Sequence, residues 1–362
     1  IIHQAVLGIT ASDQTIAYSN VIDQGIDYVM INGLKGKDVL DSIVLTAIGN
    51  QVSEENSIVP SNAVIKNGKK DVTANYQFSY QPGRLIIERL AISVPMAISL
   101  IYNGKEQIGV ESGTGYTIEG NTGVNVDIYT ATATLDSNHC WEDGSVEAKE
   151  ITWSIAPAKM ENIKANGYTG VYDGNAHGIT VTDYPSGVTV WYGTEDGIYD
   201  LAENPTYTGA GIYTVYYRLT SPNYETVIGS ATVTIERKAI DYPVAKTGLV
   251  YNGKDQNGVE SGEGYALDNA VAKNAGSYVA TAVLNDNYKW SDDKTEDAAI
   301  DWKIEKKEVT ASITANGGVY NGESFPALVK LEGVVENETV IVTLIYTKKG
   351  EAAGSADAPK DA

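Results

Sequence analysis

One fifteen-residue stretch occurs twice in the chain with few changes. It reads YNGKEQIGVESGTGY over residues 102–116 and YNGKDQNGVESGEGY over residues 251–265. The likeness extends without a gap from 102–155 onto 251–304, a constant offset of 149 (251 − 102), with roughly half of the positions identical. Self-similarity at a long fixed period indicates a tandem array of similar structural units.

Looser copies of the same landmarks occupy the rest of the chain. The order Tyr-Asn/Asp-Gly, alternating strand, Asn-Tyr, exit strand recurs at Tyr172-Asp173-Gly174, 211–215, Asn223-Tyr224 and 231–235. A further copy opens at Tyr320-Asn321-Gly322, and a divergent one contains Tyr18-Ser19-Asn20, Asn75-Tyr76 and 85–88. These landmarks predict five repeats, called the first to the fifth below: 1–89 (divergent), 90–157 (YNG type), 158–236 (Ig-like, YDG type), 237–305 (YNG type) and 306–362 (partial, truncated).

The ends of the repeats carry two further expectations. The joins at 154–159, 235–238 and 304–307 contain no Gly/Ser-rich linker, which predicts limited bending between repeats and a semi-rigid rod. The fifth repeat stops where the fourth continues into its long strand, so we expect the natural protein to extend further, since a missing pair of strands would leave a sheet edge bare. Any export signal is expected to have been removed or to lie outside the sequence.

The composition favours strands joined by glycine turns. Glycine (36) and tyrosine (24) are abundant and phenylalanine (2) is scarce. Residues 129–135, 213–219 and 278–284 alternate with period two, as strands with one buried face do. Asn-Gly and Asp-Gly pairs supply the positive φ of tight hairpin turns. We therefore predict an all-β protein, a tandem array of Ig-like β-sandwich units forming an elongated rod, with β-grasp-like units as the alternative and helix, if present, short.

Charge and cysteine content exclude several classes of protein. A formal net charge of −21 argues against nucleic-acid binding, because phosphate backbones need a basic patch. No apolar run approaches the roughly 18 residues of a membrane helix, so no membrane insertion is expected. The one cysteine, Cys140, cannot form an internal disulfide, and the three histidines do not cluster with metal-ligand spacing.

The order of these landmarks resembles a known family. Tyr-Asn/Asp-Gly, Gly-x-Tyr-Thr, Asn-Tyr and the exit strand are similar to the glycine-rich, mostly-β repeats (MBG and related Ig-like repeats) of bacterial cell-surface adhesins, and residues 62–88 resemble the closing half of another repeat type from such proteins. The resemblance implies export, attachment to the cell wall of a Gram-positive bacterium, and a role as stalk or adhesive module. It supplies no catalytic residues, and no Leu-Pro-x-Thr-Gly anchor is present in the sequence.

Two stretches suggest catalysis and have a simpler structural interpretation. Gly104-Lys105 is followed by Glu106 instead of Ser/Thr, with no helix signal, so the repeated stretch is interpreted as turns and not as a phosphate loop. His139-Cys140 contains the parts of a nucleophilic dyad, but neighbours on a strand point to opposite faces. The fourth repeat has Tyr288-Lys289 at the same positions, which favours a partly packed loop or strand site.

Acidic loops and two lysines are the weaker candidates for special chemistry. Asn285-Asp286-Asn287, Asp292-Asp293 and Glu296-Asp297, with Asp136, Glu142 and Asp143 in the second repeat, offer oxygen atoms to Ca²⁺, although the glycine-fixed spacing of an EF-hand is missing. We expect solvated acidic loops. Lys105 and Lys254 are the lysines considered for a Lys–Asn bond promoted by a buried acid.

Aromatic residues of the third repeat suggest a glycan-binding platform. Trp191 and Tyr192, near Tyr199 and Tyr207, are of the type that stacks on sugar rings. On an alternating strand one of Trp191 and Tyr192 is expected in the core and the other at the surface.

The sequence therefore predicts a non-enzymatic segment of a secreted or wall-attached bacterial adhesin, extracellular and monomeric, that binds an unidentified host or microbial protein or glycan. The alternative is a carbohydrate-binding module array of a larger extracellular hydrolase. No catalytic, cofactor-binding or metal-binding residue is nominated, and no cofactor is expected.

Overall fold

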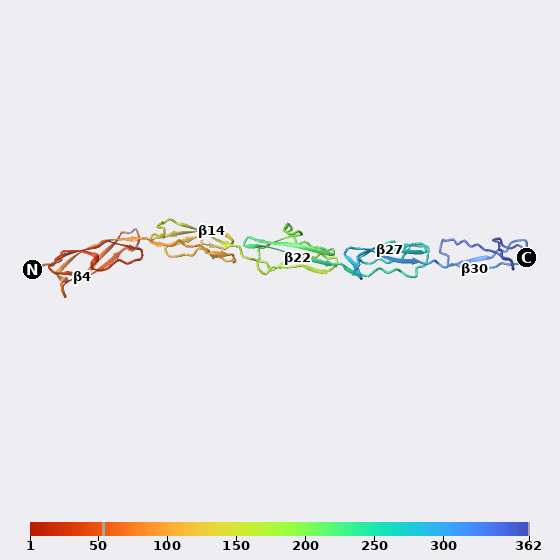
Figure 1. The fold of residues 1–362 in the computed structure, drawn as a ribbon, viewed down its shortest axis with the longest axis horizontal. Coiled ribbons are helices and arrows are strands. Elements are labelled where there is room, and N and C mark those ends of the chain that lie inside the picture. The colour runs from red at the N-terminus through yellow and green to blue at the C-terminus, as the bar shows by residue number, and fades with distance from the viewer. Residues whose placement is uncertain (53–54, 361–362) are drawn as a thin grey trace. The chain divides into compact units, whose positions relative to one another are not determined.

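The chain is all-β. The computed structural model describes residues 1–52 and 55–360, and within them the only helices are two three-residue 3-10 turns, η1 (Ile26–Tyr28) and η2 (Thr73–Asn75). Figure 1 shows the strands as arrows along the chain. In this described part no helix has the length and apolar character that crossing a membrane requires. The predicted scarcity of helix is confirmed, as are the three alternating strands.

Contacts divide the chain into two compact units. The first comprises 1–161, 185–189 and 220–227, and the second comprises 162–184, 190–219 and 228–362. The five ranges expected from the sequence stay a prediction, and the third of them is shared between the two units.

The first repeat, in the first unit, is a two-layer sandwich. Its sheets have the orders β3-β1-β7 and β2-β8-β5-β4, with β6 paired to β5. Buried Leu7, Ile9, Ile58 and Ile65 form the centre of its core. The strands are β1 (Ala5–Ala11), β2 (Gln14–Ala17), β3 (Val29–Asn32), β4 (Val39–Ile48), β5 (Asn56–Asn67), β6 (Lys70–Asp71), β7 (Tyr76–Gln81) and β8 (Gly83–Glu88).

In the second repeat, also in the first unit, two two-stranded ribbons cover one face of a four-stranded sheet. The sheet has the order β10-β16-β14-β12, and the ribbons are β11-β13 and the parallel pair β15-β9. Trp153 and Trp141 are buried. The strands are β9 (Leu90–Ile92), β10 (Ser99–Ile101), β11 (Gln107–Ile108), β12 (Tyr116–Glu119), β13 (Thr122–Gly123), β14 (Asp127–Leu135), β15 (His139–Trp141) and β16 (Lys149–Ala156).

The fourth repeat, in the second unit, repeats this plan. Its sheet has the order β25-β27-β29, and its ribbons are β24-β26 and β23-β28. Trp302 and Trp290 take the places of the two tryptophans of the second repeat. The strands are β23 (Lys238–Ile240), β24 (Gln256–Asn257), β25 (Tyr265–Asp268), β26 (Val271–Ala272), β27 (Gly276–Leu284), β28 (Tyr288–Trp290) and β29 (Ala298–Ile304).

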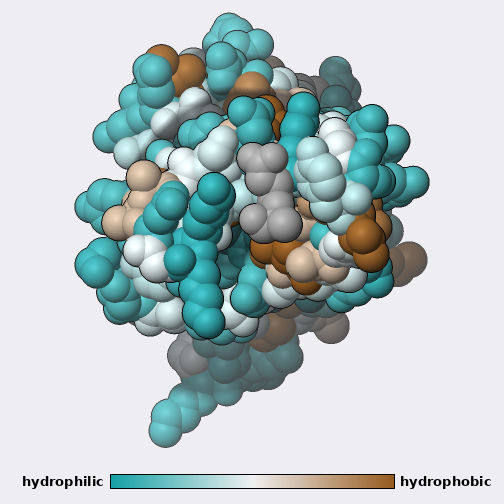
Figure 2. Space-filling model, turned by 90° about the vertical axis from the view of Figure 1, so that its right-hand side faces the viewer, coloured by the Kyte–Doolittle hydropathy of each residue, from teal (hydrophilic) through white to brown (hydrophobic). Residues whose placement is uncertain are grey.

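The third and fifth repeats complete the strand order. The third has a sheet of order β18-β22-β21-β20 and a ribbon β17-β19, and the fifth has the pair β30-β31. The strands are β17 (Lys164–Asn166), β18 (Tyr168–Val171), β19 (Thr180–Thr182), β20 (Thr189–Gly193), β21 (Gly211–Ser221), β22 (Tyr224–Glu236), β30 (Thr310–Thr314) and β31 (Leu328–Glu332). Ile313, Leu328, Ile341 and Ile345 of the fifth repeat are exposed. Figure 2 shows brown side chains among mostly teal and white ones.

Four repeats share one pairing, in which an entry strand lies parallel to the exit strand of the same repeat. The register is continuous for β2 with β8, β10 with β16 and β18 with β22, and reduced to the bridge Val250–Glu305 in the fourth repeat. The next residue is always a tyrosine whose N–H donates to the exit strand, at 2.8, 2.9, 2.8 and 2.9 Å for Tyr18, Tyr102, Tyr172 and Tyr251. Sheet faces covered by strand ribbons make these units β-sandwiches of the Ig-like class, as predicted, and the divergent first repeat shares their pairing.

Candidate functional site

The Tyr-Asn-Gly turn of the repeated stretch is a corner between sheets. Gly104 and Gly253 have φ of +76° and +77°, so the predicted positive φ is confirmed. The predicted hairpin is wrong, because the two strands that flank the turn do not pair with each other: β10 pairs with β16, and β11 pairs with β13. Asn103 Oδ1 accepts the Lys105 N–H at 2.9 Å and Asn252 Oδ1 accepts the Lys254 N–H at 2.9 Å, which is an Asx turn.

The later glycines of the stretch lie against aromatic rings. A Cβ on Gly109 would come within 1.9 Å of the Trp153 ring, and a Cβ on Gly258 would come equally close to the Trp302 ring. The absence of a side chain thus lets the indole lie directly on the backbone. The same use of glycine in both copies supports the structural interpretation of the motif over a phosphate loop.

His139 is a core residue of the second repeat. It lies on β15 with an exposed fraction of 5%, and the buried, half-buried, buried pattern of the strand places Cys140 on the opposite face, as predicted. His139 Nδ1 lies 2.6 Å from Asp136 Oδ1. Hydrogen bonds from His139 and from the Asn138 N–H outweigh burial and lower the pKa of Asp136. The structure therefore pairs the imidazole with a carboxylate and leaves the thiol on the other side of the strand.

The acidic loops are paired internally. Lys294 and Tyr242 donate to Asp292, which lowers the pKa of that carboxyl, and Lys289 pairs with Asp293 at 2.6 Å. Ser145 and then Lys149 bring the pKa of Asp143 to about 2. Within the described ranges, no group of three or more His, Cys, Asp and Glu side chains has an arrangement suited to a metal ion.

We expect calcium to bind no more than weakly. Asp292, Asp293 and Asp143 would each have to give up a lysine or hydroxyl partner before accepting a cation. Calorimetric titration of the full chain with millimolar CaCl₂ is expected to give only heats of dilution, with MgCl₂ as control. Saturable heat that disappears in D292N would contradict this expectation.

The aromatic residues of the third repeat do not form a shared platform. Trp191 and Tyr192 are both half-buried, so the predicted division into core and surface is wrong. The loop after β20 folds back, and Tyr192 exchanges backbone hydrogen bonds of 2.8 and 3.0 Å with Leu201. Burial raises the pKa of Tyr192.

The other two tyrosines have separate partners. Tyr207 stacks on Tyr213 with centroids 4.0 Å apart, and the Arg218 guanidinium lies 5.3 Å from the centre of the Tyr199 ring.

Lys105 and Lys254 lie on exposed corners of the chain. The Asx turn places their backbone N–H groups toward an asparagine side chain. A Lys–Asn bond requires an amine beside a buried acid, and these exposed corners do not provide that environment.

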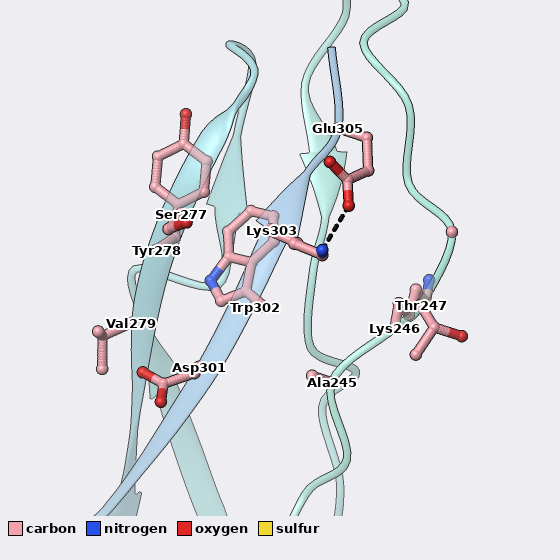
Figure 3. Close-up of a pocket in the computed structure, with 11 residues that line it drawn as sticks. Ala245, Lys246, Thr247, Ser277, Tyr278, Val279, Asp301, Trp302, Lys303 and Glu305 are labelled. Atoms are coloured by element: carbon pink, nitrogen blue, oxygen red, sulfur yellow. Dashed lines mark ion pairs between the residues drawn. The ribbon is translucent and has the colours of Figure 1, made fainter. Parts of the chain in front are cut away.

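The fourth repeat contains a cavity of about 540 Å³. Figure 3 shows Ala245, Lys246 and Thr247 on one side of it and residues of β27 and β29 on the other. The lining residues are Ala245, Lys246, Thr247, Gly248, Ser277, Tyr278, Val279, Asp301, Trp302, Lys303 and Glu305.

The cavity lacks the parts of a reaction centre. Lys303 pairs with Glu305, Lys246 pairs with Glu260, and the Tyr278 hydroxyl donates to the Asn274 carbonyl at 2.7 Å. Its lining, all within the described part of the chain, includes no His or Cys. The arrangement offers a small polar and apolar surface for binding and no activated nucleophile.

One inserted residue lies in the segment that lines one side of this cavity, which the sequence reasoning missed. Six residues run AISLIY over 97–102 where seven run AKTGLVY over 245–251, and Gly248 takes a φ of +74°. Ala97 and Ala245 bridge to equivalent valines, and Tyr102 and Tyr251 donate to equivalent positions of the exit strand, so the extra residue forms a bulge between these two points. The signal was the start of the gapless alignment at Tyr102, just after the insertion.

Comparisons with known proteins give structural neighbours only. No family model matches the chain, and no curated protein does. It is similar to Sidekick-1 immunoglobulin domains 1–5, with 11% identity, TM-score 0.19 and coverage of 91% of this chain and 86% of that one. It is also similar to the insect immune protein hemolin, with 11% identity, TM-score 0.19 and coverage of 84% of this chain and 100% of that one. The extracellular cadherin domains 1–5 of protocadherin gamma B2 are 11% identical, with TM-score 0.20 and coverage of 79% of this chain and 72% of that one. At these TM-scores the likeness does not assign a function.

Proposed function

We propose that the chain is a non-enzymatic segment of a bacterial cell-surface adhesin, serving as a stalk or as an adhesive β-repeat module. Its most conspicuous motif carries this proposal. In the second and the fourth repeats, the glycines of the repeated stretch are used to seat tryptophan and tyrosine rings. Motif residues that serve packing alike in two copies are what a structural repeat requires.

Sequence resemblance supports an extracellular setting, and charge disfavours one class of partner. A formal net charge of −21 disfavours nucleic acid and keeps a long chain soluble. The landmark order resembles repeats of Gram-positive surface adhesins. The partner that we propose is a host or microbial surface protein or glycan, contacted through loops or strand edges.

Labelling of intact cells tests the location. An antibody raised against residues 1–362 is expected to label unlysed cells of the source bacterium, and brief trypsin treatment of those cells is expected to remove the label. A cytosolic protein serves as the lysis control. Label that appears only after lysis, and that trypsin leaves unchanged on intact cells, would overturn the proposal.

A glycan array separates the adhesin from the carbohydrate-binding alternative. A stalk is expected to bind no glycan on the array. Binding that is lost in W191A and kept in Y184A would instead favour a carbohydrate-binding module array.

A further inference from the structure

The Asn-aromatic pair and the turn that follows the entry strand (Tyr-x-Gly, or Tyr-Ser-Asn in the first repeat), both found as landmarks within repeats, meet across the joins between repeats. Asn138-His139 of the second repeat lies at Tyr18 of the first, and Asn223-Tyr224 of the third repeat lies at Tyr102 of the second. Both of these contacts belong to the first compact unit.

In the second compact unit, Asn287-Tyr288 of the fourth repeat lies at Tyr172 of the third. We infer that each of these three Asn-aromatic turns is a binding element whose partner is the tyrosine turn of the preceding repeat, Tyr-x-Gly in the second and third repeats and Tyr-Ser-Asn in the first. We call each such set of contacts a clasp.

The asparagine side chain provides the polar part of the clasp. Its Oδ1 accepts a backbone N–H from the loop before the long strand of the preceding repeat: Val52 to Asn138 at 2.9 Å, Val126 to Asn223 at 2.9 Å, and Ala210 to Asn287 at 2.7 Å. Its Nδ2 donates to the residue before that donor, to Gln51 Oε1 at 2.6 Å or Asn125 Oδ1 at 3.1 Å. At the third join this preceding residue is glycine, which has no acceptor side chain.

The neighbouring aromatic ring provides the apolar part. The ring pairs Tyr18–His139, Tyr102–Tyr224 and Tyr172–Tyr288 all have centroids 5.4 Å apart, with interplanar angles of 75°, 79° and 69°. Edge-to-face contact at this distance is favourable for aromatic pairs. The same geometry at three joins, with histidine in place of tyrosine at one, shows that the position requires a ring and not a particular hydroxyl.

Backbone contacts tie the clasp to the join itself. A residue at or next to the start of the later repeat donates its N–H to the carbonyl of the clasp asparagine: Leu90 at 3.0 Å, Ala158 at 3.1 Å and Lys238 at 3.0 Å. The asparagine N–H is held in turn by the side chain two residues earlier, Asp136, Ser221 or Asn285. The asparagine is therefore oriented by contacts within its own repeat, independently of the preceding repeat.

The last glycine of the opening stretch makes room for the ring. A Cβ on Gly115 would come within 2.7 Å of His139, and one on Gly264 would come within 2.6 Å of Tyr288. Their φ values of +89° and +83° also favour glycine. The repeated stretch thus serves the clasp as well as the interior of its own repeat.

Hydrogen exchange at single amides of the full chain tests the clasp. In N223A the Val126 amide is expected to exchange at least about tenfold faster, because its acceptor is lost. N223D keeps an oxygen acceptor, so its Val126 amide is expected to stay within about threefold of the wild type. N257A, which replaces an exposed asparagine outside any clasp, is expected to change nothing at Val126.

Equal Val126 exchange in the wild type and N223A would overturn the inference, as would equal acceleration in N223A and N257A. If N223A does not fold, Y224L provides the second test, since it removes the ring and keeps the asparagine. Y224L is expected to accelerate Val126 exchange, and no change there would also count against the clasp. The clasp rests on the expected repeat division and not on adhesion, so a negative result in cell labelling leaves this test intact.

Discussion

Replacing Gly258 by alanine is expected to destabilise the fourth repeat by about 3 kcal/mol. The new Cβ would meet Trp302 Cε3 at 1.9 Å and Trp302 Cδ2 at 2.0 Å, far below van der Waals contact. The indole cannot move aside easily, because it is buried, stacks on Tyr278 at 4.7 Å and donates to the Asn269 carbonyl at 3.2 Å. Hydrogen exchange of β27 amides gives the free energy of opening of this repeat without requiring two-state unfolding of the whole chain.

A second glycine in the same repeat provides the control for this substitution. A Cβ on Gly276 would come no closer than 3.4 Å, to the hydroxyl end of Tyr278, and Gly276 does not have a positive φ. G276A is expected to cost less than about 1 kcal/mol. The packing argument fails if the β27 amides are equally protected from exchange in G258A and in G276A.

Truncating Trp290 to alanine is expected to cost the fourth repeat about 4 kcal/mol. The side chain is fully buried, packs with Ala282 and Ala298, and stacks on Tyr242 at 4.5 Å with an interplanar angle of 17°. Its Nε1 donates to the Glu296 carbonyl at 2.8 Å, so truncation also removes the hydrogen-bond partner of that carbonyl. Urea unfolding, monitored through hydrogen exchange of the β27 and β28 amides, measures this change in stability.

Phenylalanine at the same position separates the loss of the whole ring from the loss of the hydrogen bond and of part of the volume. W290F keeps a ring against Tyr242 and loses the Nε1 donor, so about half of the loss in W290A is expected. Wild-type protection of β27 and β28 amides in W290A would show that the second layer of the sandwich does not depend on the indole.

Local pattern predicted the elements of this fold because their signals are local. Period-two alternation located β14, β21 and β27, and the glycine-rich turns carried the expected positive φ. Pattern did not show which elements pair. Tyr-Asn-Gly looks like a hairpin turn in sequence, yet the strand before it pairs with the exit strand some fifty residues later, over Ser99–Ile101 with 154–156.

The clasps escaped sequence reasoning for the same reason. Their asparagines and backbone donors are separated by 86, 97 and 77 residues, so no window of the sequence contains both partners. Trp191 and Tyr192 show another limit, because both are half-buried although they are neighbours on β20, and Tyr192 pairs through its backbone with Leu201 of the following loop. In both cases the strand pattern alone did not give the contacts that its residues make.

The parallel pairing of entry and exit strands has a mechanical consequence. In the second repeat, the chain approaches the ladder at the Ser99 end of β10 and leaves it at the Ala156 end of β16, and these ends lie at opposite limits of the paired segment. Tension that reaches β10 from one side and β16 from the other therefore slides one strand along the other and strains all of their hydrogen bonds together. An antiparallel terminal pair would be peeled open one bond at a time, so this topology suits a protein that must resist being stretched.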